Sequence, residues 1–199
     1  MNRTMIALAA LAALAACGNP ATGEGNGVVT NNAMLGNEMA STNGAMTNAM
    51  TSPVANAPSD AATYLAKAGA GDLFEVESSK ALIARSTNAD AKMFARMMID
   101  AHTQSTAKLK AAAKEAGLTV ATPVLDAEQQ RMLDEIKSAS PDKVDALYHA
   151  HQATAHTAAL ALHKHYAEAG DTPTLKTAAS EIVAVVEKHL AELDKLSAT

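Results

Sequence analysis

Residues 89–117 read ADAKMFARMMIDAHTQSTAKLKAAAKEAG, and this stretch decides the fold. Some of its residues recur at alternating steps of four and three, which gathers them along one side of an α-helix. They are Ala91, Ala95, Met98, His102, Ser105, Leu109 and Ala112. This stripe is apolar except for Ser105 and for one imidazole at its centre. Because a buried polar ring costs free energy unless it finds partners, His102 either is hydrogen-bonded by neighbouring helices or helps to hold a ligand.

The rest of the chain shows the same helical period and no strand-like alternation. We expect long helices over about 60–86, 88–117, 141–170 and 173–196, and a shorter helix over about 126–138. Two helical pairs with short turns, joined by a longer connection, predict an all-α, up-and-down four-helix bundle with one crossover that contains the short helix. In the last long helix His189 stands at the centre of an apolar stripe, as His102 does in the second.

The N-terminus is typical of an export signal. Arg3 precedes an apolar run from Met5 to Leu14, which is too short to span a membrane. Leu14-Ala15-Ala16-Cys17 resembles the lipobox of bacterial lipoproteins, which implies cleavage before Cys17 and lipidation of its thiol. We therefore expect a signal peptide over 1–16, a lipidated Cys17 that anchors the protein to a membrane, and a location in the bacterial envelope at the periplasmic side of the outer membrane.

Composition divides the remainder and excludes several classes. Residues 17–59 are rich in Asn, Gly, Thr, Ala and Met without a persistent period, which predicts a flexible linker before a folded domain over 60–199. The formal net charge of −5 gives no basic footprint for nucleic acid. Since Cys17 is the sole cysteine, neither an internal disulfide framework nor a cysteine-rich metal site is available.

Two helices leave the identity of their core-facing groups open. The third long helix carries His149, His156 and His163 at seven-residue intervals on one face, while a competing face includes His151 and His165, and periodicity does not decide between them. On the first helix Glu75 and Glu77 point in directions about 200° apart, so only one of them can face the bundle axis. Glu77 lies on an apolar stripe that we take as the core face; its other members are Ala66, Ala70, Leu73, Ala81 and Ala84.

Imidazoles and a carboxylate from four helices can form a metal site. Neutral histidine suits Zn, Cu or Fe, and a carboxylate can complete a four-coordinate shell. The other interpretation is a polar core layer in which the glutamate accepts hydrogen bonds from the imidazoles, because buried polar groups generally find partners.

At these residues the chain resembles the bacterial envelope family known as domain of unknown function 4142. The resemblance is carried by GDLFEVE at 71–77, FARMMIDAH at 94–102 and His189-Leu190. It implies an exported, ferritin-like four-helix domain without an established reaction, and it identifies His156 as the third-helix histidine. Because Ile99 and Val186 stand three residues before His102 and His189, the Glu-x-x-His pattern of di-iron proteins is missing.

These observations lead to three competing functions. The first is a membrane-anchored protein that binds a transition metal or a small ligand through Glu77, His102, His156 and His189, with Glu75 and His149 as alternative ligands. The second is a structural or protein-interaction module of the envelope whose histidines form a hydrogen-bonded layer. The third, an enzyme with a redox metal, ranks below both, because the sequence shows no nucleophile with a neighbouring base and no phosphate-binding loop.

Overall fold

The computed structural model describes residues 57–196, which form five α-helices and no strand. The helices are α1 (Ala61–Arg85), α2 (Ala89–Glu115), α3 (Ala127–Ser138), α4 (Val144–Ala169) and α5 (Pro173–Leu196). The prediction of four long helices and one short helix is therefore confirmed. The predicted signal peptide, the lipidation site Cys17 and most of the predicted linker lie outside the described residues. In the part that is described, no helix is both long and apolar enough to cross a membrane.

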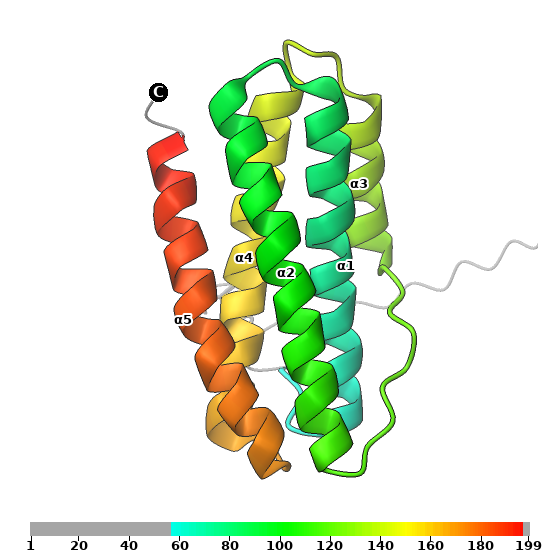
Figure 1. The fold of residues 1–199 in the computed structure, drawn as a ribbon. Helices are drawn as coiled ribbons and strands as arrows, with labels where there is room; N and C mark the ends of the chain where they lie inside the picture. Colours follow the sequence, from blue (N-terminus) through cyan, green and yellow to red (C-terminus); the bar gives the residue numbers. More distant parts are fainter. Residues whose placement is uncertain (1–56, 197–199) are drawn as a thin grey trace, which may run out of the picture. The chain divides into compact units, whose positions relative to one another are not determined.

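The four long helices pack as a ring in the order α1, α2, α5, α4. In Figure 1, α1 and α5 run in one direction and α2 and α4 in the other, so each long helix is antiparallel to both of its neighbours. The chain leaves α2 at one end of the bundle and returns toward the other end through an extended segment and α3, which packs outside the ring against α1 and α4. This is the predicted up-and-down bundle with one crossover.

Capping residues explain where several helices begin and end. A side-chain oxygen of Asp60 accepts a hydrogen bond from the backbone N–H of Thr63 (2.8 Å), which fixes the start of α1. Asp126 and Gln129 form a reciprocal capping box at the start of α3. After α2, Gly117 has a φ of 71°, a left-handed conformation that glycine adopts at little cost, and it turns the chain into the extended segment.

Two large apolar clusters fill the ring of long helices, one toward each end, and a third, small cluster joins α1 to α3. Along α2, Leu109 belongs to the first cluster and Met98 to the second; along α5, Val186 belongs to the first and Leu193 to the second. In both helices a buried histidine stands between the two clusters, and α1 and α4 likewise carry buried polar side chains at this level. The core is therefore divided by a polar layer, which is where the candidate site lies.

Candidate metal centre

Three buried histidines from three helices face one another in this layer. His102 of α2 is 6% exposed, His156 of α4 is 1% exposed and His189 of α5 is 4% exposed. Their ring centroids are 5.3–5.5 Å apart, and one ring nitrogen from each lies within 4.8 Å of the other two. We refer to these three residues as the histidine cluster.

The spacing of the cluster is close to that of a metal site. Two nitrogens bound tetrahedrally at about 2.0–2.1 Å from Zn²⁺ lie about 3.3–3.4 Å from each other. Nε2 of His156 and Nδ1 of His189 are 3.2 Å apart, which matches that separation. The other separations extend to at most 4.8 Å, so a metal ion would draw the rings together by a small movement of side chains.

His102 is held by a buried carboxylate on α1. Its Nδ1 lies 2.9 Å from Oδ1 of Asp72, and Oδ2 of the same carboxylate accepts a hydrogen bond from the hydroxyl of Thr106 at 2.9 Å. Because a carboxylate only accepts, Nδ1 carries the proton in neutral His102, and its lone pair is then on Nε2. A carboxylate behind a histidine in this way is the usual support for a metal-ligating imidazole.

His156 is oriented in the same manner. Its Nδ1 donates to the backbone carbonyl of Gln152 at 3.0 Å and lies 3.4 Å from Oε1 of Glu75, which is 3% exposed. The lone pair of neutral His156 is therefore on Nε2, the nitrogen that faces His189. Asp72 and Glu75 thus stand behind two different histidines, so Nε2 of His102 and Nε2 of His156 both face the interior of the cluster.

The protonation equilibria of the cluster differ from one ring to another. Burial, together with the neighbouring His102 and His156, lowers the pKa of His189 to about 3, so His189 is neutral at pH 7. Burial also lowers the pKa of His102, but the hydrogen bond to Asp72 and the negative charges of Glu75 and Asp72 outweigh it, and the net shift is upward. A metal ion binding here competes with a proton on His102.

Unpaired polar atoms concentrate around the cluster. In the described part of the chain, five buried side-chain atoms have no hydrogen-bond partner, and all but one belong to residues of this level: Glu75 Oε2, His102 Nε2, Ser105 Oγ and Gln152 Oε1. Buried polar atoms without partners are uncommon, because each costs about 1–3 kcal/mol. Such a concentration in one layer indicates that the layer is arranged for something besides its own hydrogen bonds.

One predicted ligand is placed elsewhere by the structure. The expectation that Glu77 faces the core is wrong: its side chain is 37% exposed and pairs with Lys80 on the helix surface at 2.9 Å. Glu75 is the buried glutamate instead. The helix is rotated relative to the predicted stripe, and its buried side includes a series at steps of four and three that contains polar residues: Ala61, Leu65, Ala68, Asp72, Glu75, Ser79 and Leu82.

The alternative ligand His149 does not join the cluster. Its Nε2 donates to the backbone carbonyl of Leu193 at 3.0 Å in a partly buried position. The third histidine of the seven-residue series, His163, is buried but pairs with the hydroxyl of Tyr64 at 2.9 Å. Among the described residues, His156 is therefore the one histidine of α4 that belongs to the histidine cluster.

Two supporting residues had no part in the sequence prediction. Asp72 lies one helical turn before Glu75 and shares its face, a signal available from the 4-3 spacing once the correct side of α1 is known. Gln152 lies one turn before His156 and donates from Nε2 to the hydroxyl of Ser78 at 3.2 Å. Because Gln152 interrupts the apolar stripe of α4, no hydrophobic pattern points to it.

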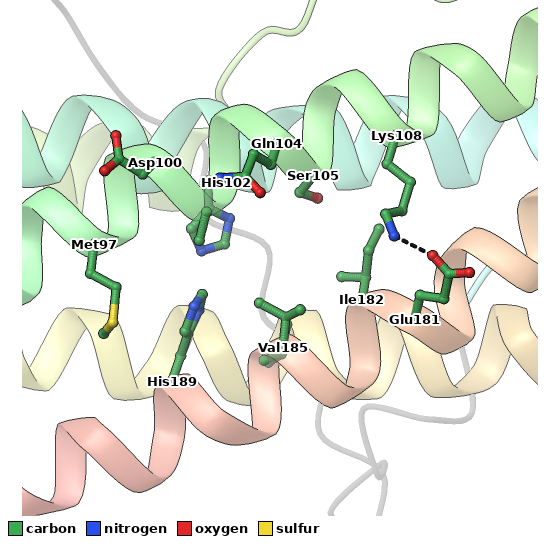
Figure 2. Close-up of a pocket in the computed structure, with 12 residues that line it drawn as sticks. Met97, Asp100, His102, Gln104, Ser105, Lys108, Glu181, Ile182, Val185 and His189 are labelled. Carbon is green, nitrogen blue, oxygen red and sulfur yellow. Dashed lines mark hydrogen bonds and ion pairs between the residues drawn. The ribbon is translucent and has the colours of Figure 1, made fainter.

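A pocket of ≈ 490 Å³ between α2 and α5 reaches the cluster (Figure 2). His102 and His189 lie on its opposite sides and point toward each other, and the Lys108–Glu181 ion pair closes its far end. Between the two histidines and this ion pair, the wall of the pocket is mainly apolar and includes Ile182, Val185 and Val186 of α5. The cluster is therefore buried and still open on one side.

Comparisons with known proteins agree with this fold. A crystal structure of a DUF305 fragment from Deinococcus radiodurans is similar with a TM-score of 0.60 at 12% identity, covering 70% of this chain and 96% of that one. At this identity the likeness concerns the fold alone. No curated protein sequence matches significantly. The model of the family described as "Domain of unknown function (DUF4142)" matches residues 45–196, which include every residue of the histidine cluster. Since that match spans most of the length of this chain, the chain belongs to the DUF4142 family.

Proposed function

We propose that this protein binds one transition metal ion through His102, His156 and His189 and does so as a lipid-anchored component of the bacterial envelope. The observation that carries the metal proposal is Nε2 of His102, a buried lone pair that faces the other two imidazoles without a partner among the described residues. Leaving it unsatisfied costs about 1–3 kcal/mol, whereas a metal ion at the centre uses it directly.

Charge also supports a divalent ion. Asp72 and Glu75 bring two carboxylates into the layer, and both act through space on His102. Three neutral imidazoles and a divalent ion, with these two carboxylates behind them, form a group without net charge, which is the least costly state in a buried site. Imidazole nitrogens suit Zn, Cu and Fe, and the cluster offers no sulfur that would select among them.

The polar-layer function rests on a different observation. His156 and His189 already hydrogen-bond to each other at 3.2 Å, and Asp72 already accepts from His102, so much of the layer is satisfied without an ion. In that case the bundle is an interaction or structural module and the histidines select its packing. The two functions differ in what they predict for Nε2 of His102, which only the metal uses.

Metal content separates the two functions. The full chain is purified without chelator, and bound metal is measured by elemental analysis beside the variants His102→Gln, His189→Gln and His149→Gln. Metal binding predicts about one ion per chain, lost in the first two variants and kept in His149→Gln, whose ring lies outside the cluster. Added Zn²⁺ or Cu²⁺ should also raise the melting temperature, because a ligand of the native state stabilises it. Metal-free protein with an unchanged melting temperature would favour the polar layer.

The anchor is tested separately. The sequence around Cys17 supports lipidation, and a lipidated chain sediments with membranes in the native host. The variant Cys17→Ala should move the protein to the soluble fraction while the purified bundle keeps its metal. If wild type and Cys17→Ala fractionate alike, the anchor proposal fails and the metal proposal is unaffected.

A further inference from the structure

The pocket between α2 and α5 meets the histidine cluster on one side only. His102 and His189 line it, whereas His156 does not and lies behind them on α4. Figure 2 shows the two lining imidazoles directed into the space between the helices. A molecule in this pocket of ≈ 490 Å³ would therefore approach the centre of the cluster from the side opposite His156.

Two unpaired polar atoms belong to residues that line the pocket. They are Nε2 of His102 and Oγ of Ser105, both buried and both without a hydrogen-bond partner in the described structure. The residues lie three positions apart on α2, so they share one helix face with a rise of about 4.5 Å between them. The hydroxyl of Ser105 therefore lies within one helical turn of the cluster. It can donate a hydrogen bond to a small molecule bound there or accept one from that molecule.

The cluster supplies three protein ligands, and a tetrahedral ion takes four. Among the described residues, no carboxylate lies within ligand spacing of all three histidines, and Oε1 of Glu75 faces Nδ1 of His156, the outer nitrogen of that ring, at 3.4 Å. Sites with a structural metal are closed by four protein ligands, whereas sites that admit a water or substrate have three. Resting on the metal site proposed above, we propose that the α2–α5 pocket admits a small, uncharged nitrogen- or oxygen-donor molecule to the fourth coordination position.

The preference for an uncharged molecule follows from the surroundings. Asp72 and Glu75 already balance the charge of a divalent ion. The pocket lining adds Asp100 and the paired Lys108 and Glu181, so it supplies no excess positive charge. An anion would bring an unbalanced charge against an apolar wall, which costs free energy, while a neutral donor would not.

Cobalt(II) gives the test a direct optical readout, because its visible absorption changes when a fourth or fifth ligand binds. The full chain is loaded with Co²⁺ and titrated with imidazole at pH 8, where the probe is mostly neutral. The variant Val185→Phe fills the pocket mouth, and Val124→Phe is the matched control, since both valines are exposed and only the first lines the pocket. The proposal predicts that Val185→Phe keeps its cobalt spectrum but binds imidazole about tenfold or more weakly, as expected when a tight space is overfilled.

A second titration tests the selectivity and the hydroxyl. The ratio of imidazole to acetate affinity is measured for the protein and for a tris-imidazole cobalt complex in solution, which removes the intrinsic preference of the ion. The protein's ratio should be larger by about tenfold because of the charge balance. Ser105→Ala should weaken imidazole binding by about three- to tenfold, the usual contribution of one hydrogen bond.

The outcomes are distinct. Cobalt uptake with no spectral response to imidazole, or with equal responses in Val185→Phe and Val124→Phe, overturns the open position and leaves the metal site standing. A ratio equal to that of the solution complex overturns the selectivity for uncharged molecules. A protein that takes up no cobalt overturns both this inference and the metal site on which it rests.

Discussion

Nδ1 of His102 lies 2.9 Å from Oδ1 of Asp72, and the two residues come from different helices of the bundle. The carboxylate fixes which nitrogen of the imidazole carries the proton and which direction its lone pair faces. Asp72 is therefore a positioning residue for the cluster, and its own second oxygen is held by Thr106. The arrangement gives the first prediction.

Asp72→Asn should weaken metal binding about 10–100-fold, the usual effect of losing the acid behind a ligating histidine. The amide keeps the shape but removes the charge that makes the imidazole a better ligand. Affinity is measured by calorimetric titration of Zn²⁺ into metal-free protein. Asp134→Asn is the control, because Asp134 pairs with Gln130 on an exposed helix surface and should bind as wild type does.

The two neighbouring glutamates of α1 form a matched pair for the second prediction. Glu75→Gln removes a buried carboxylate beside His156 and should lower metal affinity, whereas Glu77→Gln removes an exposed carboxylate that pairs with Lys80. The Glu77→Gln variant should change the free energy of unfolding by at most about 1 kcal/mol and leave the metal affinity unchanged. Equal losses in both variants would contradict the placement of Glu75 behind His156.

The third prediction concerns pH in the metal-free protein. Burial lowers the pKa of His163 to about 4, against 6.5 in the unfolded chain. The unfolded state therefore binds a proton first, so this contribution to stability is fully present above pH 6.5 and is lost as the pH falls toward 4. The same sign holds for His189, whose pKa is about 3, and the opposite sign holds for His102, whose raised pKa favours the folded state at low pH.

Acidification removes the stabilising contributions of His163 and His189, and of these three histidines only His102 acts in the opposite direction. The free energy of unfolding should therefore decrease as the pH is lowered from 6.5 to 5. For His163, whose pKa falls from 6.5 to about 4 on folding, the full loss is on the order of 3 kcal/mol. Urea unfolding in the presence of a chelator, followed at several pH values, gives the change of the free energy of unfolding per pH unit. The variant His163→Gln should reduce this change by up to about 1.4 kcal/mol per pH unit, the effect of one proton. A slope that this substitution leaves unchanged would show that His163 is not the titrating group.

The fourth prediction separates the site from the rest of the core. The hydroxyl of Tyr64 lies 2.9 Å from Nδ1 of His163, outside the histidine cluster, and burial raises the pKa of Tyr64, so the phenol stays protonated and donates. Tyr64→Phe leaves a buried acceptor unpaired and should cost about 1–3 kcal/mol of stability. Its metal affinity at 25 °C should equal that of wild type. Thermal unfolding and zinc titration of the same samples check both halves.

Helices α2 and α5 could be predicted closely because their buried stripes are apolar apart from one histidine each. The central histidines His102 and His189 follow directly from that pattern. On α1 the hydrophobic pattern misled, because the side that carries Asp72 and Glu75 is more polar than the neighbouring Ala/Leu stripe. Residues that serve a site break the rule by which a core face is recognised, and the hydrophobic pattern therefore points to Glu77 instead of Glu75.

The side of α4 that faces the core could not be predicted for a related reason. Its buried residues follow neither of the two candidate faces for the whole length: Tyr148 lies on the face that includes His151, whereas His156 and His163 lie on the other, and Gln152 lies between them. Steps of four in the first half rotate the buried side relative to the seven-residue series of the second half. The partners that settle this rotation are on other helices, and one sequence does not contain their positions.

The order in which the site residues occur along the chain has a consequence for biosynthesis. His189 belongs to α5, the last of the five described helices along the chain, whereas Asp72 belongs to α1. A nascent chain that still lacks α5 has at most two of the three imidazoles and an uncovered α2 face. A metal ion bound as proposed above would therefore find its three imidazoles together only after α5 has packed onto α2 and α4.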